Sequence, residues 1–448
     1  MIAATVAFLV AALWTLQYTT RALRPRPSVS LLLFAALLLV HVAPMLIYLH
    51  VTGPDTFIYE AALAPVDAEP VKARVLWALT WMFVSLMVGA GLARLIAPRS
   101  WVRAQWAASR PAPRHVASVY RASSALRLVL WLVAASMLAV ILIEDQPAKI
   151  LNYFASGESE LEKLLLRSED GGTRFYVYNV FLYSVAPFLV MVLWCMRRAH
   201  PKDHELGALF ACFFVLVVVG KLGTLSKAPP VIFVLQLALL YLLLKGKALS
   251  WWPLTKLLLL ALALLAVVVK LTIPEIELSA VLQFLYYRVF DIPNEVVLEY
   301  FAAFPRVLRH GWEYGIFGPL SRSANELVLP NYSVVAELTR DSLDSTSNVM
   351  FVGDAWAEYA WPGVVFSSFA AGLLVRSIDL YSLRKGFTDE WACLVAGCAF
   401  GVFTMLSTAL STALVTGGLI LIPMASWLFA RRSTRTRAAT ASTLSRST

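Results

Sequence analysis

The stretch that decides the fold is residues 29–51, VSLLLFAALLLVHVAPMLIYLHV, which contains no Asp, Glu, Lys or Arg. A membrane-spanning helix needs about 20 mainly apolar residues, so this stretch is long enough to cross a bilayer. Irregular backbone cannot face lipid, and we therefore predict a helix wherever such a stretch recurs. The predicted fold class is an all-α polytopic membrane protein with about eleven transmembrane helices. The expected spans are 2–18, 29–51, 75–97, 128–144, 176–195, 207–224, 230–245, 254–272, 362–381, 391–408 and 412–430.

The composition of the chain agrees with this prediction. Of its 448 residues, 59% are hydrophobic and 15% are charged, and the mean hydropathy is +0.71. Soluble domains are about 45–50% apolar and about 25% charged. The chain is therefore too apolar for a soluble enzyme, a nucleic-acid-binding protein or a disordered protein, in spite of its net charge of +10.

Positive charge indicates the orientation in the membrane. More than half of the 38 Lys and Arg residues fall in alternate connections and in the C-terminal tail. The positive-inside rule makes these segments cytoplasmic, with a periplasmic N-terminus and a cytoplasmic C-terminus. We expect spans one to eight in 1–272, an outer loop in 273–361, spans nine to eleven in 362–430 and a disordered basic tail in 431–448.

The outer loop is too apolar to be a simple linker. Amphipathic helices are predicted over 278–290 and 294–304, which Pro293 and Pro305 punctuate. Aromatic residues after residue 310 favour a position at the bilayer surface. The sequence therefore predicts interfacial or re-entrant helices that cap the membrane bundle.

The loop and its neighbouring spans carry cations that suit a phosphate or pyrophosphate. An arginine fork binds phosphate through two hydrogen bonds. Alternatively, each arginine pairs with an acid of the same loop, and the lysines extend their ammonium groups to the interface. For Lys221 and Lys270 we expect this second, snorkelling role. The candidate phosphate ligands are Arg288, Arg306, Arg309, Arg322, Arg340 and Lys227, the last within the turn Ser226–Pro230.

Acidic and aromatic residues supply candidates for proton transfer and sugar stacking. Asp354 and Glu358 are four residues apart and share a face if they lie on a helix, where either can accept a proton from an attacking hydroxyl. Their alternative role is to stabilise a helix N-terminus. His310 is a reserve base or a surface residue. Tyr287 and Trp356 can stack on sugar rings or pack at the membrane interface.

The chain has no GxxxxGK[ST] motif, no GxGxxG after a predicted strand and no metal-ligand cluster. We therefore expect no nucleotide cofactor and no resident metal, and no nucleic-acid partner.

Three blocks resemble the Wzy-type polymerases of oligosaccharide repeat units. They are Ser345–Gly363 followed by Gly372, the SKAPP turn at 226–230, and Tyr286-Tyr287-Arg288 with Asn294 and Tyr300-Phe301. Two positions depart from the family pattern: Ala360 stands where a glycine is expected, and Lys227 where Arg is common.

The resemblance implies a GT-C-like glycosyltransferase of the bacterial inner membrane that takes part in polysaccharide or lipopolysaccharide biosynthesis. Such a protein transfers a glycan from undecaprenyl pyrophosphate to the terminal sugar of another lipid-linked repeat unit, at the periplasmic face. Carried to this chain, Arg288 holds the donor pyrophosphate with help from the other cations, and Asp354 or Glu358 acts as base or orients the acceptor. Its partners are the lipid-linked oligosaccharide, the bilayer and a chain-length regulator.

Other functions stay open at this point. An O-antigen ligase uses the same donor and is typically associated with a histidine in its outer loop, which His310 supplies. A transporter or flippase of lipid-linked glycans would show discontinuous helices and internal repeats. The sequence has no convincing repeat, and the long outer loop is evidence against a transporter. A monosaccharide transferase of the dolichyl-phosphate-sugar type is disfavoured, because the first connection is short and basic.

Overall fold

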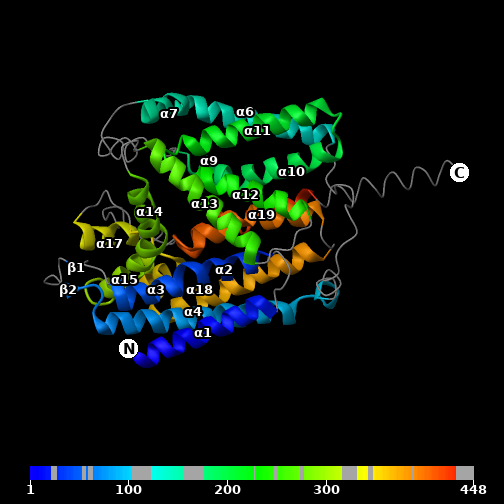
Figure 1. Ribbon diagram of the computed structural model, residues 1–448. Helices are drawn as coiled ribbons and strands as arrows, with labels where there is room; N and C mark the ends of the chain where they lie inside the picture. The colour runs from blue at the N-terminus through cyan, green and yellow to red at the C-terminus, as the bar shows by residue number, and fades with distance from the viewer. Residues whose placement is uncertain are drawn as a thin grey trace. The chain divides into compact units, whose positions relative to one another are not determined.

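The computed structural model describes residues 1–21, 28–52, 57–58, 64–102, 123–155, 175–226, 228–245, 251–272, 277–314, 330–341, 347–384 and 388–429. Within these ranges the chain is helical apart from turns and one antiparallel pair of short strands, β1 (Phe57–Ile58) and β2 (Ala64–Pro65) (Figure 1). The chain divides into two compact units. The first comprises Met1–Arg99, Glu277–Leu380 and Val402–Ala413, and the second comprises Ser100–Ile276, Tyr381–Gly401 and Leu414–Thr448.

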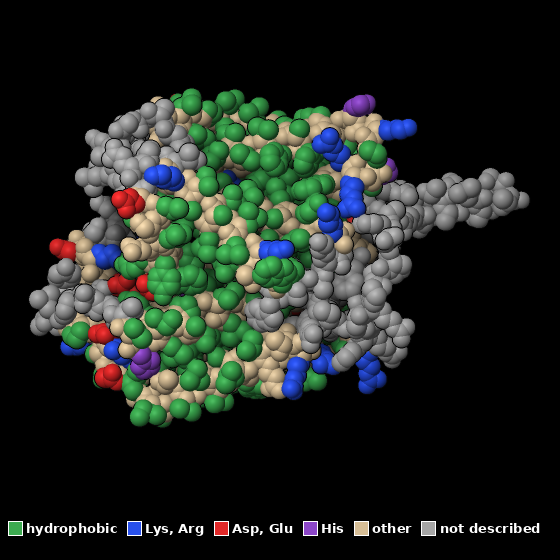
Figure 2. Space-filling model, viewed as in Figure 1, with side chains coloured by type: hydrophobic (Ala, Val, Ile, Leu, Met, Phe, Trp, Pro, Cys, Tyr) green, Lys and Arg blue, Asp and Glu red, His purple; other side chains and the backbone are tan. Residues whose placement is uncertain are grey.

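Seven helices among the described residues are long and apolar enough to cross a membrane. The protein is therefore an all-α, multi-pass membrane protein, and apolar side chains cover much of the face drawn in Figure 2. The total of eleven spans stays a prediction. The seven helices are Ile2–Arg21, Val29–Val51, Glu69–Ile96, Ser124–Ile143, Tyr176–Ala199, His204–Leu222 and Phe351–Ser382, and Ala228–Leu244 is a shorter apolar helix.

The first unit is built on long helices that pack lengthwise. Its membrane helices are α1 (Ile2–Arg21), α2 (Val29–His41) with α3 (Ala43–Ile47) and η1 (Tyr48–Thr52), α4 (Glu69–Ile96) and α18 (Phe351–Leu383). Its other elements are α14 (Leu278–Tyr286), η4 (Tyr287–Asp291), α15 (Ile292–Ala303), η5 (Trp312–Tyr314) and α17 (Asn331–Arg340), with α20 (Leu410–Val415) at its edge. The predicted helices over 278–290 and 294–304 are present, but Pro293 does not separate them, and the helical stretch runs from Leu278 to Ala303.

Two glycines set the distance between α4 and α18. A Cβ on Gly89 would lie 2.1 Å from the carbonyl oxygen of Phe369, and one on Gly372 would lie 2.0 Å from that of Leu86. Small residues at a helix crossing let two backbones touch, which is a common way of packing helices in membranes. These two positions therefore hold α4 and α18 in direct backbone contact.

Helix α18 starts eleven residues before the expected span and is broken near its first third. At Ala360 the backbone has φ 52° and ψ −141°, a conformation that is costly for a residue with a Cβ. Pro362 follows two residues later, and a proline has no backbone N–H to donate the hydrogen bond that would continue the helix. The expected border at 361/362 between outer loop and ninth span therefore falls inside this helix, and Asp354, Trp356 and Glu358 are helical residues.

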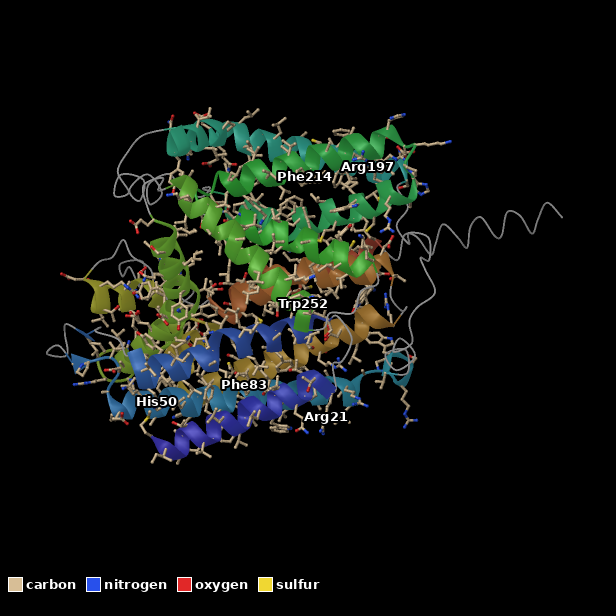
Figure 3. The ribbon with its side chains drawn as sticks, viewed as in Figure 1. Arg21, His50, Phe83, Arg197, Phe214 and Trp252 are labelled. Atoms are coloured by element: carbon tan, nitrogen blue, oxygen red, sulfur yellow. The ribbon has the colours of Figure 1, made fainter. Side chains whose placement is uncertain are left out.

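The two ends of the first unit differ in what they carry. Arg21 ends α1 at one end of the unit's helices, and His50 lies at the opposite end (Figure 3). The elements β1, β2, α15 and α17 lie at the His50 end (Figure 1). If Arg21 marks the cytoplasmic side, as predicted, these elements are on the periplasmic side.

The second unit contains α6 (Ser124–Ile143), α7 (Gln146–Ala155), α9 (Tyr176–Val180), η3 (Phe181–Val185), α10 (Ala186–Ala199) and α11 (His204–Leu222). It continues with α12 (Ala228–Leu244), α13 (Trp251–Thr272) and α19 (Asp389–Met405). Arg127 links α6 to the start of α11 by donating to Asp203 at 2.6 Å, while Asp203 also accepts the amide of Leu206 at 3.1 Å and so caps α11.

Lys221, in the last turn of α11, corrects one prediction. Its side chain was expected to snorkel, but it is fully buried, and its Nζ lies 4.8 Å from the ring centre of Tyr183 and 5.0 Å from that of Phe400. The two rings stack on each other at 5.5 Å. The snorkelling prediction for Lys221 is wrong because rings from two other helices close over a position that looks terminal in sequence. Lys270 is exposed.

The last expected span, 412–430, is not one unbroken helix. Helix α20 ends at Val415, and Gly418 takes a left-handed φ of 80° before helix resumes at residue 421. The hydropathy of the sequence predicts the apolar stretch but not the turn within it. Gly418 can make this turn because glycine adopts a positive φ without a steric penalty.

Candidate functional site

The candidate site lies in the first unit, where α15, α17 and the first part of α18 come together. Helix α15 has Pro293 in its first turn, and every residue from Asn294 to Ala303 is buried. Asn294 anchors it, because its amide donates to the carbonyl of Val40 at 3.0 Å and its Oδ1 contacts Nδ1 of His41 at 2.9 Å. The polar residues of α15 are thus held within the body of the unit.

Asp354 and Glu358 form a carboxyl pair one turn apart on α18. Their side chains contact each other, and both are partly buried. Asn331, at the start of α17, donates its side-chain amide to Oδ1 of Asp354 and is itself buried. The sequence prediction that these acids share one helical face therefore agrees with their placement, and Asn331 fixes the position of the first.

A cluster of aromatic rings is built around Trp356, which lies on the same turns of α18 as the carboxyl pair but on another face of the helix. Trp356 stacks on Phe301 with ring centres 4.5 Å apart, and it meets the edges of His310 at 4.9 Å and Trp361 at 5.4 Å. The amide of Gly311 donates to the carbonyl of Ala357 at 3.2 Å, which ties the segment after α15 to α18. His310 and Trp356 are therefore side by side although the sequence separates them by a long loop.

Arg74 of α4 closes this cluster from another side. Its Nη1 donates to the carbonyl oxygens of Phe301 at 3.0 Å and Phe304 at 3.4 Å, and its guanidinium carbon lies 5.8 Å from the ring centre of Trp356. These carbonyls belong to the end of α15, where helical carbonyls lack partners within the helix. Arg74 thus satisfies the end of α15 and orders the rings.

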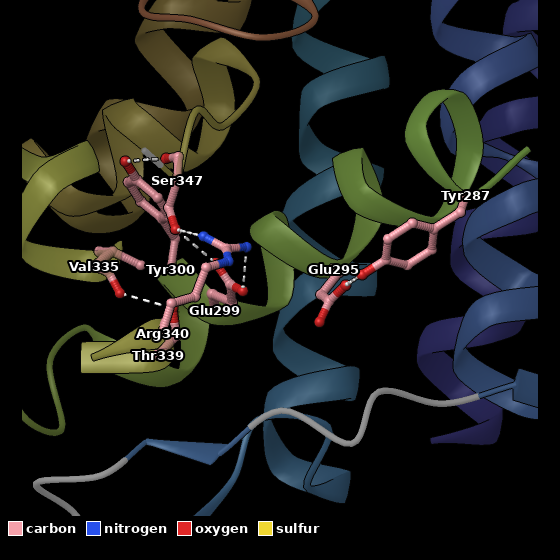
Figure 4. A network of polar contacts seen from close by, with 8 residues as sticks. All are labelled: Tyr287, Glu295, Glu299, Tyr300, Val335, Thr339, Arg340 and Ser347. Carbon is pink, nitrogen blue, oxygen red and sulfur yellow. Dashed lines mark hydrogen bonds and ion pairs between the residues drawn. The ribbon is translucent and has the colours of Figure 1, made fainter. Parts of the chain in front are cut away.

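A buried ion pair joins α15 to α17. Arg340 donates through Nη2 to Oε1 of Glu299 at 2.8 Å and through Nη1 to Oγ of Ser347, and Ser347 donates to the other oxygen of Glu299 at 3.0 Å. Figure 4 shows Arg340 between Ser347 and Glu299. Tyr300 donates to the carbonyl of Ser347 at 3.0 Å. Glu299 is fully buried, whereas the Arg340 side chain is 31% exposed.

Burial dominates the electrostatics of these groups. It raises the pKa of Glu299 from 4.5 to about 7, although the Arg340 guanidinium opposes the shift. Burial, reinforced by the nearby charge of Glu295, also raises the pKa of Asp291 above its ordinary value. For Tyr300, burial raises the pKa well above 10, with Asp354 and Glu299 adding to the effect. Tyr300 therefore stays neutral, and it interacts electrostatically with one member of the carboxyl pair and with both members of the ion pair.

Several predicted site residues meet in this region. Asp354, Glu358, His310, Trp356 and Arg340 contribute to the arrangement described above. Tyr287 lies at the start of η4, three helical turns before Glu299. Its hydroxyl donates to Oε2 of Glu295 at 3.4 Å (Figure 4).

Other predicted cations take different positions. Arg288 is exposed and lies over the ring of Phe284, with 5.3 Å from guanidinium carbon to ring centre. Arg306 is exposed, and Arg309 pairs with Glu313 at 3.4 Å on the surface. Lys227 and Arg322 lie outside the described residues. For Arg309 and Arg340, the alternative prediction of pairing with an acid of the loop describes the observed contacts.

Sequence reasoning missed Arg74, Asn331 and Ser347, and it treated Glu299 only as a possible partner of an arginine. The one available signal was the position of Arg74 directly before an expected span, since a charge at that place needs a partner. Asn331 and Ser347 are ordinary loop residues in sequence, and their roles follow only from the packing of α17 against α15.

The region offers two carboxyl groups that can accept a proton, and a separate group of aromatic rings with His310 and Arg74. Among the described residues, no group of three or more His, Cys, Asp or Glu side chains has the geometry of a metal site.

We compared the chain with family models, curated proteins and solved structures, and none of them matched it.

Proposed function

We propose that this protein is a polysaccharide polymerase of the bacterial inner membrane, which extends glycans carried on undecaprenyl pyrophosphate at the periplasmic face. The observation that carries the proposal is the Asp354–Glu358 pair, which Asn331 of α17 holds on the first turns of α18. A carboxyl group held in place suits the removal of a proton from an attacking sugar hydroxyl. The resemblance of Ser345–Gly363 to the Wzy-type family supports the same function.

In the proposed reaction, the hydroxyl oxygen of the acceptor sugar forms a bond to the anomeric carbon of the donor glycan. The bond from that carbon to the pyrophosphate oxygen breaks, and its electron pair leaves with the undecaprenyl pyrophosphate. Asp354 or Glu358 takes the hydroxyl proton and later releases it to water. Cations stabilise the negative charge of the leaving group.

Arg340 is the predicted cation that pairs with Glu299 in the same region of the first unit. Its guanidinium is partly exposed, so a phosphate can approach it without displacing the whole ion pair. We keep Arg288 as the proposed principal ligand of the pyrophosphate, with Arg306, Arg309, Arg322 and Lys227 as further ligands. The exposed position of Arg288 leaves it accessible to a lipid-linked donor.

An O-antigen ligase is the second candidate, and His310 favours it. Among the described residues, no group hydrogen-bonds the buried Nδ1 of His310, so this nitrogen is available to a substrate.

The test is the surface-polysaccharide ladder of the native host on a gel. The strains compared are wild type, a gene deletion, and chromosomal Arg288→Ala, Asp354→Asn and Glu358→Gln. Glu277→Gln is the matched control, because Glu277 is an exposed carboxylate at the start of α14, outside the site. Immunoblots verify that every variant reaches wild-type abundance.

The polymerase proposal expects the deletion and Arg288→Ala to collapse the ladder to a single capped repeat. At least one of the two acid variants should do the same, while the control keeps the full ladder. Long lipid-linked chains without attachment would instead assign the chain as a ligase. An unchanged ladder in the deletion would exclude both enzymes and favour a transporter.

A further inference from the structure

A row of three carboxyl groups runs along one side of the helix that joins η4 to α15. Asp291, Glu295 and Glu299 follow each other at four-residue spacing, which places them on one face. We call these three residues the carboxyl row. Glu299 is fully buried, Glu295 is 9% exposed and Asp291 is partly exposed, and Tyr287 beside them is 46% exposed. The row therefore leads from the surface at Tyr287 to the ion pair with Arg340.

Tyr48, from η1, lies beside the row. Its side chain is 3% exposed, and its hydroxyl interacts electrostatically with Asp291, Glu295 and Glu299. Among the described residues, this hydroxyl has no hydrogen-bond partner, and the buried Oδ1 of Asp291 has none either. A buried polar group that lacks a partner is costly, and such groups normally have one. Tyr48 and Asp291 therefore have hydrogen-bonding capacity available to a molecule that enters from the exposed end.

The chemistry of the row restricts what that molecule is. Carboxylates accept hydrogen bonds, and a tyrosine hydroxyl both donates and accepts. A ligand must then offer several donors and no negative charge, because like charges at short range repel. A sugar with free hydroxyl groups meets both conditions, whereas a sugar that carries a carboxylate fails the second.

We propose that the carboxyl row and Tyr48 bind the acceptor glycan through the hydroxyl groups of its terminal sugars, and that they select against acidic sugars at this place. This inference rests on the proposed function, which it deepens by naming the class of acceptor. Asp291 ends η4, Glu295 and Glu299 lie on α15, and Glu299 pairs with Arg340. Tyr300 interacts electrostatically with both Glu299 and Asp354, so the inner end of the row lies on the side of α15 that faces the carboxyl pair.

The test measures glycan binding to the purified full-length protein in lipid nanodiscs. The probe is the pool of free repeat-unit oligosaccharides that mild acid releases from the lipid-linked material of the native host. Asp291→Asn keeps the shape of the side chain and removes its charge, and Tyr48→Phe removes only a hydroxyl. Glu277→Gln is the control, and thermal melting establishes that each variant is folded.

We expect Asp291→Asn to raise the Kd about tenfold, since the ligand's hydrogen bonds to this side chain lose the assistance of its charge. Tyr48→Phe should raise it several-fold, and the control should leave it unchanged. A probe oxidised at its primary hydroxyls to carboxylates should bind more weakly than the neutral probe, and this difference should shrink in Asp291→Asn.

Wild-type affinity in both folded variants would overturn the inference, and so would the absence of binding to the wild-type protein. The ladder experiment tests the polymerase proposal separately from this binding result. A ladder that depends on the protein, together with binding that ignores Asp291 and Tyr48, refutes the inference alone. Binding that depends on both residues, together with an intact ladder in the deletion, refutes the polymerase alone.

Discussion

Replacing Arg340 with Met should destabilise the protein by an amount that grows with pH. In the wild type, the pKa of Glu299 is about 7 when folded, against an ordinary 4.5. Because the pKa of Glu299 is higher in the folded than in the unfolded protein, its contribution to the stability is largest below about pH 4.5. This contribution falls as the pH rises from about 4.5 to about 7, and it is constant at higher pH.

Arg340→Met removes the guanidinium that opposes the pKa shift, so the pKa of Glu299 rises further. The folded variant then keeps a proton that the wild type releases above pH 7. Each pH unit of this difference amounts to about 1.4 kcal/mol. The free energy lost through the substitution should therefore be about 2 kcal/mol larger at pH 8.5 than at pH 6, in addition to a constant loss of contacts.

The assay is equilibrium unfolding of the full-length protein in mixed micelles at pH 6, 7, 8 and 8.5. The matched control is the pair Glu299→Gln with Glu299→Gln/Arg340→Met, in which no carboxyl remains to titrate and the cost of losing Arg340 should be the same at every pH. A cost of Arg340→Met that is flat between pH 6 and 8.5, or that falls, would refute the assignment of a burial-raised pKa to Glu299.

Three further substitutions test the fold. Gly89→Ala should lower the yield of folded protein and its melting temperature, because the new Cβ would lie 2.1 Å from a backbone oxygen. Gly91→Ala is the control and should lower neither, since a Cβ there has nothing within 4 Å. Equal melting temperatures of the two variants would contradict the close crossing of α4 and α18. Ala360→Gly should raise the stability by about 1–3 kcal/mol by relieving a strained φ, as read from denaturant midpoints, and a loss of stability would show that the break lies elsewhere. Lys221→Met should leave the stability equal or raise it, since the buried ammonium makes no hydrogen bond in the described part of the chain; a loss above about 3 kcal/mol, typical of breaking a buried pair, would reveal an anionic partner.

The fold class and the acid pair could be predicted because their signals are local. A long run of apolar residues must be helical in lipid, whatever the rest of the chain does. The spacing of Asp354 and Glu358 places them on one face as soon as the segment is helical. Neither conclusion requires knowledge of which helices are neighbours.

The contacts that organise the site could not be predicted, because they join distant segments. Arg340 meets Glu299 across 41 residues, and Arg74 meets the carbonyl of Phe301 across 227 residues. Lys221 shows the same limit, since the rings that enclose it come from η3 and α19. A single sequence contains the charges but not the packing that selects their partners.

The backbone contact between α4 and α18 also bears on how this chain can change over evolutionary time. Apolar side chains that face lipid can exchange freely, because a bilayer accepts any of them. Gly89 and Gly372 cannot drift in this way, since each faces a main-chain oxygen of the other helix. Homologous chains should therefore keep small residues at both positions together, and this paired constraint offers an alignment signature that survives after the surrounding hydrophobic residues have diverged.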